Sequence, residues 1–146
     1  SLLINIMYYI QIGMKNNILK FTIYLYYLSL IVVLILYLYP GSIIGYFLYG
    51  DLGTQPNLVE NPVGTSINHF FYFFFLTFLG SIYSLNKKKF INSILFLFIL
   101  SVFLELLHLI IPNRAFELND VIANSTGVII IYFLFFLKRK FFYEKI

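Results

Sequence analysis

Few side chains in this sequence can take part in acid–base or ligand chemistry. The 146 residues contain no cysteine, two histidines and six acidic residues. Disulfides, thiolate metal sites, iron–sulfur clusters and cysteine nucleophiles are therefore excluded together. Any catalysis must use His, Glu, Asp or Arg. The candidates, together with one amide in the same part of the chain, are His69, Glu105, His108, Arg114, Asp120 and Asn124.

The spacing of these candidates places several of them on shared faces of helices. Residues three, four, seven and eleven positions apart lie on one side of an α-helix. Three sets are spaced in this way: Ser101, Glu105, His108 and Pro112 in the first, Asp120, Asn124 and Gly127 in the second, and His69, Tyr72 and Gly80 in the third. Because glycine lacks a side chain, Gly127 is also expected to let a neighbouring helix approach closely.

The elements that carry these faces must be helices that span a membrane. The chain is 61% hydrophobic and only 11% charged, with a mean hydropathy of +0.90, whereas a soluble domain has about 25% charged residues. This composition excludes a soluble monomer and a disordered chain. Four continuously apolar runs approach the roughly 20 residues that cross a bilayer: 21–39, 67–85, 90–111 and 121–137. We therefore predict an all-α polytopic membrane protein with four transmembrane helices.

The basic residues predict how these helices are oriented, because lysine and arginine resist translocation. Nine of the ten lie at one side of the predicted spans, and only Arg114 lies at the other. We expect both termini in the cytoplasm, and the loops 40–66 and 112–120 outside it, in a bacterial inner (plasma) membrane. The net charge of +4 is then explained by the basic residues on the cytoplasmic side, and no nucleic acid is expected as a partner.

The chain is predicted to consist of an N-terminal extension and one membrane domain. Residues 1–14 are apolar but too short to span a membrane. Since Met14 would make an ordinary start, our hypothesis is that the biological chain begins there. Residues 15–146 form a single four-helix domain. In its longest loop, the aromatic segment 43–49 is expected at the outer interface of the membrane, where tyrosine keeps its hydroxyl wet.

All of the polar candidates lie at one depth, toward the outer ends of the predicted spans. At about 1.5 Å per residue, Glu105 lies roughly 10 Å inside Pro112, and His69 and Asn124 are shallower. A charge at mid-span costs roughly 2.5–3.5 kcal/mol, so these residues are unsuited to face lipid. We therefore predict that three helices aim them into one polar pocket, open toward the outer leaflet.

Each of these residues also has a structural interpretation. Glu105 can serve as a packing carboxylate, either protonated or paired with Arg114, or as a proton acceptor or ligand anchor. Arg114 can lock its loop through ion pairs with Glu117 and Asp120, or grip a phosphate or carboxylate. The spacing of His69, Glu105 and His108 matches no familiar metal site. We therefore expect no metal ion and no cofactor.

The order of these residues resembles the VanZ-like membrane proteins. Those proteins carry a histidine at the head of one helix, then Glu-x-x-Gln, Pro-x-Arg and Asp-x-x-x-Asn-x-x-Gly. The matching residues, within 67–134, are His69, Glu105, Arg114, Asp120, Asn124 and Gly127. His108 stands where glutamine is usual, and Phe73 where tyrosine is common. The family is named for a protein that gives low-level resistance to the glycopeptide teicoplanin, so the resemblance implies a cell-envelope role in antibiotic resistance and implies no particular reaction.

Three functions fit these observations. The first is a non-enzymatic cell-envelope protein, embedded in membrane lipids, whose pocket binds a lipid, an envelope precursor or a glycopeptide-like ligand. The second is a small membrane enzyme that acts on a lipid-linked phosphate or acyl substrate, with Glu105 or a histidine as general base and Arg114 stabilising negative charge. The third is a structural subunit of a larger complex with membrane-protein partners. We favour the first of these functions.

Overall fold

The chain folds into five α-helices in the part that the computed structural model describes, which is residues 2–56, 64–83 and 87–143. Side chains are described for residues 16–56, 64–82 and 90–138. In chain order the helices are α1 (Leu2–Leu38), α2 (Ile43–Tyr49), α3 (Ser66–Tyr83), α4 (Lys87–Leu107) and α5 (Leu118–Tyr143). Within these ranges there is no strand, so the prediction of an all-α protein is confirmed for the described residues.

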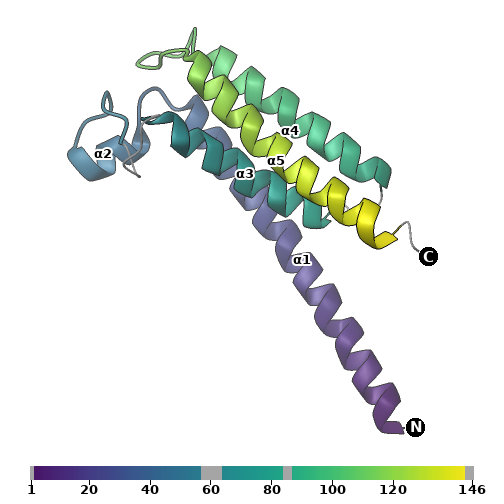
Figure 1. Ribbon diagram of the computed structural model, residues 1–146. Coiled ribbons are helices and arrows are strands. Elements are labelled where there is room, and N and C mark those ends of the chain that lie inside the picture. The colour runs from purple at the N-terminus through teal and green to yellow at the C-terminus, as the bar shows by residue number, and fades with distance from the viewer. Residues whose placement is uncertain (1, 57–63, 84–86, 144–146) are drawn as a thin grey trace.

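The helices α3, α4 and α5 lie side by side in one bundle (Figure 1). The C-terminal part of α1 packs on this bundle, and its N-terminal part extends away from it. The 37 residues of α1 correspond to roughly 55 Å at about 1.5 Å per residue, which exceeds the roughly 30 Å of a hydrocarbon core. The apolar extension 1–14 continues directly into this helix from Leu2 onward.

Tight turns and caps separate α1 from α2. Proline restricts the residue before it to extended conformations, and α1 ends just before Pro40. Gly41 then adopts a φ of 98°, and a Cβ at this position would lie 2.7 Å from the carbonyl oxygen of Leu52. The hydroxyl oxygen of Ser42 caps α2 by accepting a hydrogen bond of 2.9 Å from the backbone N–H of Gly45. The loop is therefore folded back on itself rather than extended.

The apolar core lies between the bundle helices and α1. Its fully buried apolar members are Phe73, Leu76, Leu97, Leu104, Val128 and Ile131. The most extensive helix contact is between α3 and α5, and Gly127 makes it close. A Cβ on Gly127 would lie 2.6 Å from the carbonyl oxygen of Phe70 and 2.8 Å from the backbone nitrogen of Phe74. Any side chain at position 127 would therefore push α5 away from α3.

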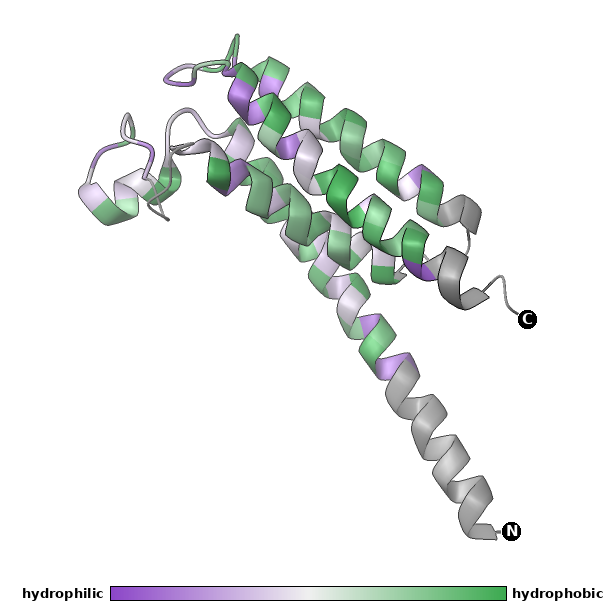
Figure 2. Ribbon diagram, in the orientation of Figure 1, coloured by the Kyte–Doolittle hydropathy of each residue, from purple (hydrophilic) through white to green (hydrophobic). Residues whose placement is uncertain are grey.

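In the part of the chain that the structure describes, three helices are long and apolar enough to cross a membrane. They are Asn16–Leu38, Phe90–Leu107 and Leu118–Lys138, and in each of them only 22% to 28% of the most apolar window is buried within the protein. Most of their surface is therefore left for lipid. Hydrophobic residues cover the bundle, whereas hydrophilic residues gather at the end that carries α2 and the α4–α5 connection (Figure 2).

The second predicted span, 67–85, corresponds to α3. Its apolar segment Ser66–Ile82 is shorter than the other three. The structure therefore confirms a helical protein with three apolar helices of membrane-spanning length in its described part. The four-span topology and the cytoplasmic position of both termini stay predictions.

The helix α4 ends earlier than the predicted run 90–111. After Leu107 the backbone tightens, and the N–H groups of His108 and Leu109 donate to carbonyl oxygens three residues back, at 3.1 and 3.2 Å. A tightened last turn is common at helix ends, and the helix cannot continue normally into the residue before Pro112. Asn113 then takes a φ of 57°, which asparagine tolerates better than most residues, and the chain turns back toward α5.

Candidate functional site

The polar candidates gather where α1, α3, α4 and α5 meet, at the end of the bundle that carries the loops. Five of the six are buried, each exposing 4% or less of its surface: His69, Glu105, His108, Asp120 and Asn124. The sixth, Arg114, lies at the edge of this group. A buried polar side chain is stable only with a partner, so the partners of each one define what the cluster can do.

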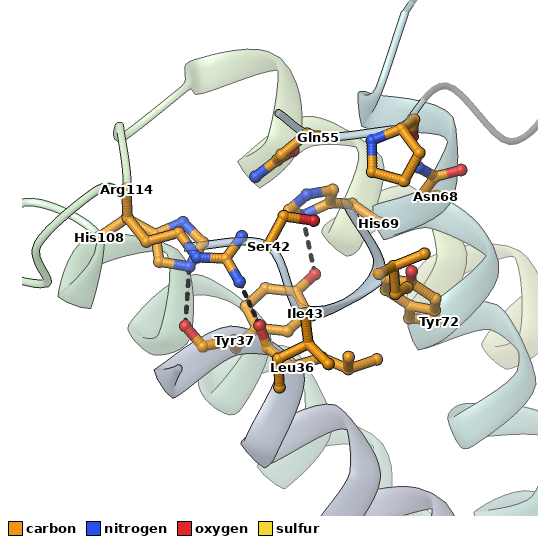
Figure 3. A pocket seen from close by; sticks show the side chains of 12 residues that line it. Leu36, Tyr37, Ser42, Ile43, Gln55, Asn68, His69, Tyr72, His108 and Arg114 are labelled. Carbon is orange, nitrogen blue, oxygen red and sulfur yellow. Dashed lines mark hydrogen bonds between the residues drawn. The ribbon is translucent and has the colours of Figure 1, made fainter. Parts of the chain in front are cut away.

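Tyr37 of α1 lies at the centre of this cluster. Its hydroxyl donates to Asn124 Oδ1 at 2.6 Å and lies 2.8 Å from His69 Nδ1, as Figure 3 shows for the histidine. Because the hydroxyl has one hydrogen, and Asn124 receives it, His69 Nδ1 must be the donor in the second contact. In a neutral ring, Nε2 of His69 is then the nitrogen that carries the lone pair.

Glu105 and His108 form a pair one turn apart on α4. His108 Nδ1 lies 3.0 Å from Glu105 Oε1, and His108 Nε2 lies 3.2 Å from the backbone oxygen of Tyr37 (Figure 3). A backbone oxygen only accepts, so Nε2 carries a hydrogen, and one further proton is shared between Nδ1 and the carboxyl group. The His108 ring also stacks on the Tyr37 ring, with centroids 5.6 Å apart. Both ring nitrogens of His108 are therefore used inside the protein.

A second carboxylate–histidine arrangement lies beside this pair. His69 Nε2 is 3.4 Å from Asp120 Oδ2, and the other oxygen of Asp120 accepts a hydrogen bond from the hydroxyl of Ser66. Glu105 Oε2 lies 3.7 Å from His69 Nδ1 and has no hydrogen-bond partner in the described part of the chain. One potential ligand atom each from His69, Glu105 and Asp120 lies within 4.8 Å of the others.

Arg114 fastens the α4–α5 loop to the end of α1. Its Nε donates to the carbonyl oxygen of Tyr39 at 3.2 Å, and its Nη2 donates to that of Leu36 (Figure 3). These carbonyls belong to the C-terminal end of α1, where no helical N–H remains to satisfy them. Burial lowers the pKa of the guanidinium from its usual value, and the carboxylate of Glu105 opposes this shift.

The ion pairs considered for Arg114 are not present. Among the described residues, every carboxylate contact within 4.0 Å of a basic group involves a histidine, so Arg114 does not pair with Glu105, Glu117 or Asp120. The backbone N–H of Glu117, rather than its side chain, reaches Glu105 Oε1, at 3.4 Å. The loop is thus held by backbone carbonyls where an ion pair was expected.

A small pocket opens beside the cluster. Its polar wall is formed by Gln55, Asn68, His69, Tyr72, His108 and Arg114 (Figure 3). Its empty volume is about 420 Å³, which includes the part open to solvent. The amide of Asn68 is anchored by a hydrogen bond of 2.9 Å to the carbonyl oxygen of Pro56. The pocket lining thus combines the guanidinium of Arg114 with the imidazoles of His69 and His108.

A comparison with protein families decides what kind of chain carries this cluster. A model of the VanZ/LLP1 family matches residues 3–139, which is most of the sequence. The chain belongs to the VanZ/LLP1 family. No curated protein and no solved structure matches it. The match extends the resemblance found over residues 67–134 to α1, the helix that contributes Tyr37.

In this VanZ/LLP1 chain, the residues that carry the resemblance lie together. The three helix faces predicted from spacing meet at one place, and at Gly127 the backbone of α3 leaves no room for a Cβ on α5. His108, which replaces the usual glutamine, completes a pair with Glu105. Whether these residues bind a ligand stays a prediction.

Two residues of the cluster were missed by the sequence reasoning. Tyr37 is one of thirteen tyrosines, and its spacing does not distinguish it from Tyr24, which is 74% exposed. Ser66 was not among the candidates, but its hydroxyl donates to Asp120. Its depth in the membrane could have indicated Tyr37. It lies three residues before Pro40, at the outer end of the predicted span 21–39, which is where the other polar candidates lie.

Proposed function

We propose that this VanZ/LLP1 chain is a non-enzymatic protein of the cell envelope that binds the anionic headgroup of a lipid or of a lipid-linked envelope precursor. The observation that carries the proposal is the position of Arg114. Its half-buried guanidinium lines the pocket while Nε and Nη2 are held by carbonyl oxygens of α1. The three remaining N–H groups, two on Nη1 and one on Nη2, are thereby fixed in direction, and guanidinium groups recognise phosphate and carboxylate well.

The walls of the pocket favour an amphipathic ligand. Leu36, Ile43 and Ile44 are apolar residues of the same lining that contains Arg114. The space of about 420 Å³ includes the part that is open to solvent and is therefore an upper bound on the room for a ligand. It is too small to enclose a whole glycopeptide, so an effect on glycopeptide susceptibility would act through the precursor.

The proposal places the pocket on the outer side of a bacterial inner membrane, and topology is its first test. The sequence contains no cysteine, so single cysteines can report the side of the membrane. In Asp51→Cys the thiol should react with a membrane-impermeant maleimide in intact cells. In Lys138→Cys the thiol should react only after permeabilisation. The reverse pattern of labelling would refute the proposed orientation.

Direct binding is the second test. The purified chain in phosphatidylcholine nanodiscs is titrated with a short-chain phosphatidylglycerol and with a short-chain polyprenyl phosphate. Loss of a charged hydrogen bond costs about 1.5–3 kcal/mol, so Arg114→Gln should weaken binding roughly 10- to 100-fold. The glutamine amide still has a donor for the α1 carbonyls, and thermal unfolding checks the fold.

Lys138→Gln serves as the matched control for this titration. It removes one positive charge from an exposed position far from the pocket lining, and its affinity should equal that of the unchanged protein. Equal affinities for all three proteins would refute headgroup binding by Arg114. A preference between the two ligands separates a lipid headgroup from a precursor.

The enzyme hypothesis is the second candidate because Glu105 and His108 share a proton beside the pocket. General acid–base groups contribute about 10²–10⁴-fold to a rate. If the chain hydrolyses a short-chain lipid phosphate or acyl ester, Glu105→Gln should lower turnover by at least about 100-fold. Absence of turnover in the unchanged protein, together with saturable binding, supports the non-enzymatic proposal.

A further inference from the structure

One potential ligand atom each from His69, Glu105 and Asp120 lies within 4.8 Å of the others at the start of α5, and His69 Nε2 faces Asp120 Oδ2. Tyr37 uses its hydrogen on Asn124, so His69 Nδ1 is the protonated nitrogen and Nε2 is not. Nε2 nevertheless lies 3.4 Å from Asp120 Oδ2. Two lone pairs at this distance repel unless a positive charge lies between them.

The third potential ligand atom is Glu105 Oε2. It is buried, it lacks a hydrogen-bond partner among the described residues, and it lies 3.7 Å from Nδ1 of the same histidine, which is beyond hydrogen-bond distance. Glu105 exposes 0% and Asp120 3% of its surface, so two carboxylates are withdrawn from water. In the described part of the chain, no lysine or arginine lies within 4.0 Å of either. Buried carboxylates are stable when they are paired or when they coordinate a metal.

The surroundings match those of a metal site. Metal–ligand lengths of about 2.0–2.2 Å put neighbouring ligand atoms of a tetrahedral site roughly 3.3–3.6 Å apart, and His69 Nε2 and Asp120 Oδ2 already have this separation. Each of the three residues is oriented by a further hydrogen bond, from Tyr37, Ser66 or His108. Such outer partners are typical of metal ligands.

We propose that His69 Nε2, Glu105 Oε2 and Asp120 Oδ2 bind one divalent transition-metal ion. A set of one imidazole and two carboxylates without thiolate suits Zn²⁺ or Mn²⁺. Of the three ligands, His69 also lines the pocket, so the proposed site adjoins it. This inference goes beyond the proposed headgroup binding and does not depend on it.

The test is metal binding by the purified full chain, carrying no polyhistidine tag, in detergent and without added lipid. After treatment with a chelator, the protein is titrated calorimetrically with Zn²⁺ and Mn²⁺, and bound metal is counted by elemental analysis. The expected result is one ion per chain. Removing an outer partner of a ligand typically costs about 10- to 100-fold in affinity, so removing a ligand itself should cost at least about 100-fold. His69→Ala and Asp120→Asn should each show this loss.

Two features keep the test decisive. Asp120→Asn retains an oxygen for the Ser66 hydroxyl and so preserves the local fold if His69→Ala does not. Glu117→Gln, at an exposed position of the same loop, is the matched control and should leave the affinity unchanged. Failure of the unchanged protein to bind an ion overturns the proposal, and so does an affinity in His69→Ala and Asp120→Asn that equals that of the unchanged protein. Either result leaves the headgroup titration with Arg114→Gln as a separate question.

Discussion

The two histidines, His69 and His108, are both buried beside Tyr37, but they differ in how many of their ring nitrogens have a hydrogen-bond partner. Both are at least 96% buried and both contact Tyr37 and Glu105. His108 has an acceptor opposite each nitrogen, so every polar atom of that side chain is satisfied within the protein. His69 is satisfied only at Nδ1, and its Nε2 faces another acceptor.

The difference teaches how a structural pair can be told from a binding site. We call Glu105 Oε1 with His108 the closed pair, and His69 with Asp120 and Glu105 Oε2 the open set. In the closed pair donors meet acceptors, which stabilises the fold and leaves nothing for a ligand. In the open set the acceptor His69 Nε2 faces the acceptor Asp120 Oδ2, and Glu105 Oε2 has no hydrogen-bond partner among the described residues, which costs stability until a cation binds. Glu105 belongs to both groups through its two oxygens.

The largest effect is expected from Glu105→Ala, because it removes the buried carboxyl group of the closed pair. Removing one partner of a buried ionic pair costs about 3–5 kcal/mol, so the metal-free protein should lose at least about 3 kcal/mol of stability. Thermal unfolding in detergent measures this loss. Glu117→Ala, at an exposed position, should change stability by less than about 0.5 kcal/mol. Equal effects of the two substitutions would contradict the closed pair.

His108 should matter for stability more than for metal binding. His108→Leu leaves Glu105 Oε1 without its side-chain donor, at a cost of about 1–3 kcal/mol. His108→Gln restores an N–H donor and should recover about half of that loss, as expected if the family's usual glutamine plays the same role. Chemical unfolding of the metal-free variants measures the difference. A loss in His108→Gln as large as that in His108→Leu would show that the pair is not held by this hydrogen bond.

Tyr37→Phe tests the link between the two groups. The ring and its stacking are retained, and the hydroxyl that joins His69 to Asn124 is removed. We expect a loss of about 1–1.5 kcal/mol of stability and a metal affinity about 10-fold lower, because Nδ1 of His69 loses its orienting partner. Tyr39→Phe, in an exposed tyrosine of the same helix end, is the control. Unchanged metal affinity in Tyr37→Phe would show that metal binding does not depend on the hydrogen bond between Tyr37 and Nδ1 of His69.

The smallest effect on metal-free stability is expected from His69→Gln. This change removes the Nε2 lone pair that faces Asp120, which offsets the lost bond to Tyr37, so stability should change by less than about 1 kcal/mol. The stabilisation that added Zn²⁺ gives the unchanged protein should disappear in this variant. Unfolding scans with and without Zn²⁺ measure both. Retained stabilisation by Zn²⁺ would place the ion elsewhere.

Much of the fold could be predicted because apolar length and helical spacing are properties of the sequence itself. The faces that carry Glu105 and Asn124 were assigned from spacing, and the structure places both in one buried cluster. The end of α4 was placed too late because the tightening of the last turn before Pro112 depends on local backbone geometry.

The partners inside the cluster could not be predicted from spacing. The partner of Arg114 is a pair of backbone carbonyls, which every residue has. The open set joins residues from three helices, so their separation along the chain carries no information about their distance. Tyr37 joins the cluster only because α1 packs against α3 and α4.

The most direct test of the central claim is the X-ray absorption spectrum of the chain loaded with one equivalent of Zn²⁺. If His69, Glu105 and Asp120 bind the ion, the spectrum should show nitrogen and oxygen ligands at about 2.0–2.2 Å and the outer scattering of one imidazole. The imidazole signal should disappear in His69→Ala and persist in His108→Gln. An ion without imidazole scattering in the unchanged protein, or a signal that depends on His108 instead, would contradict the account.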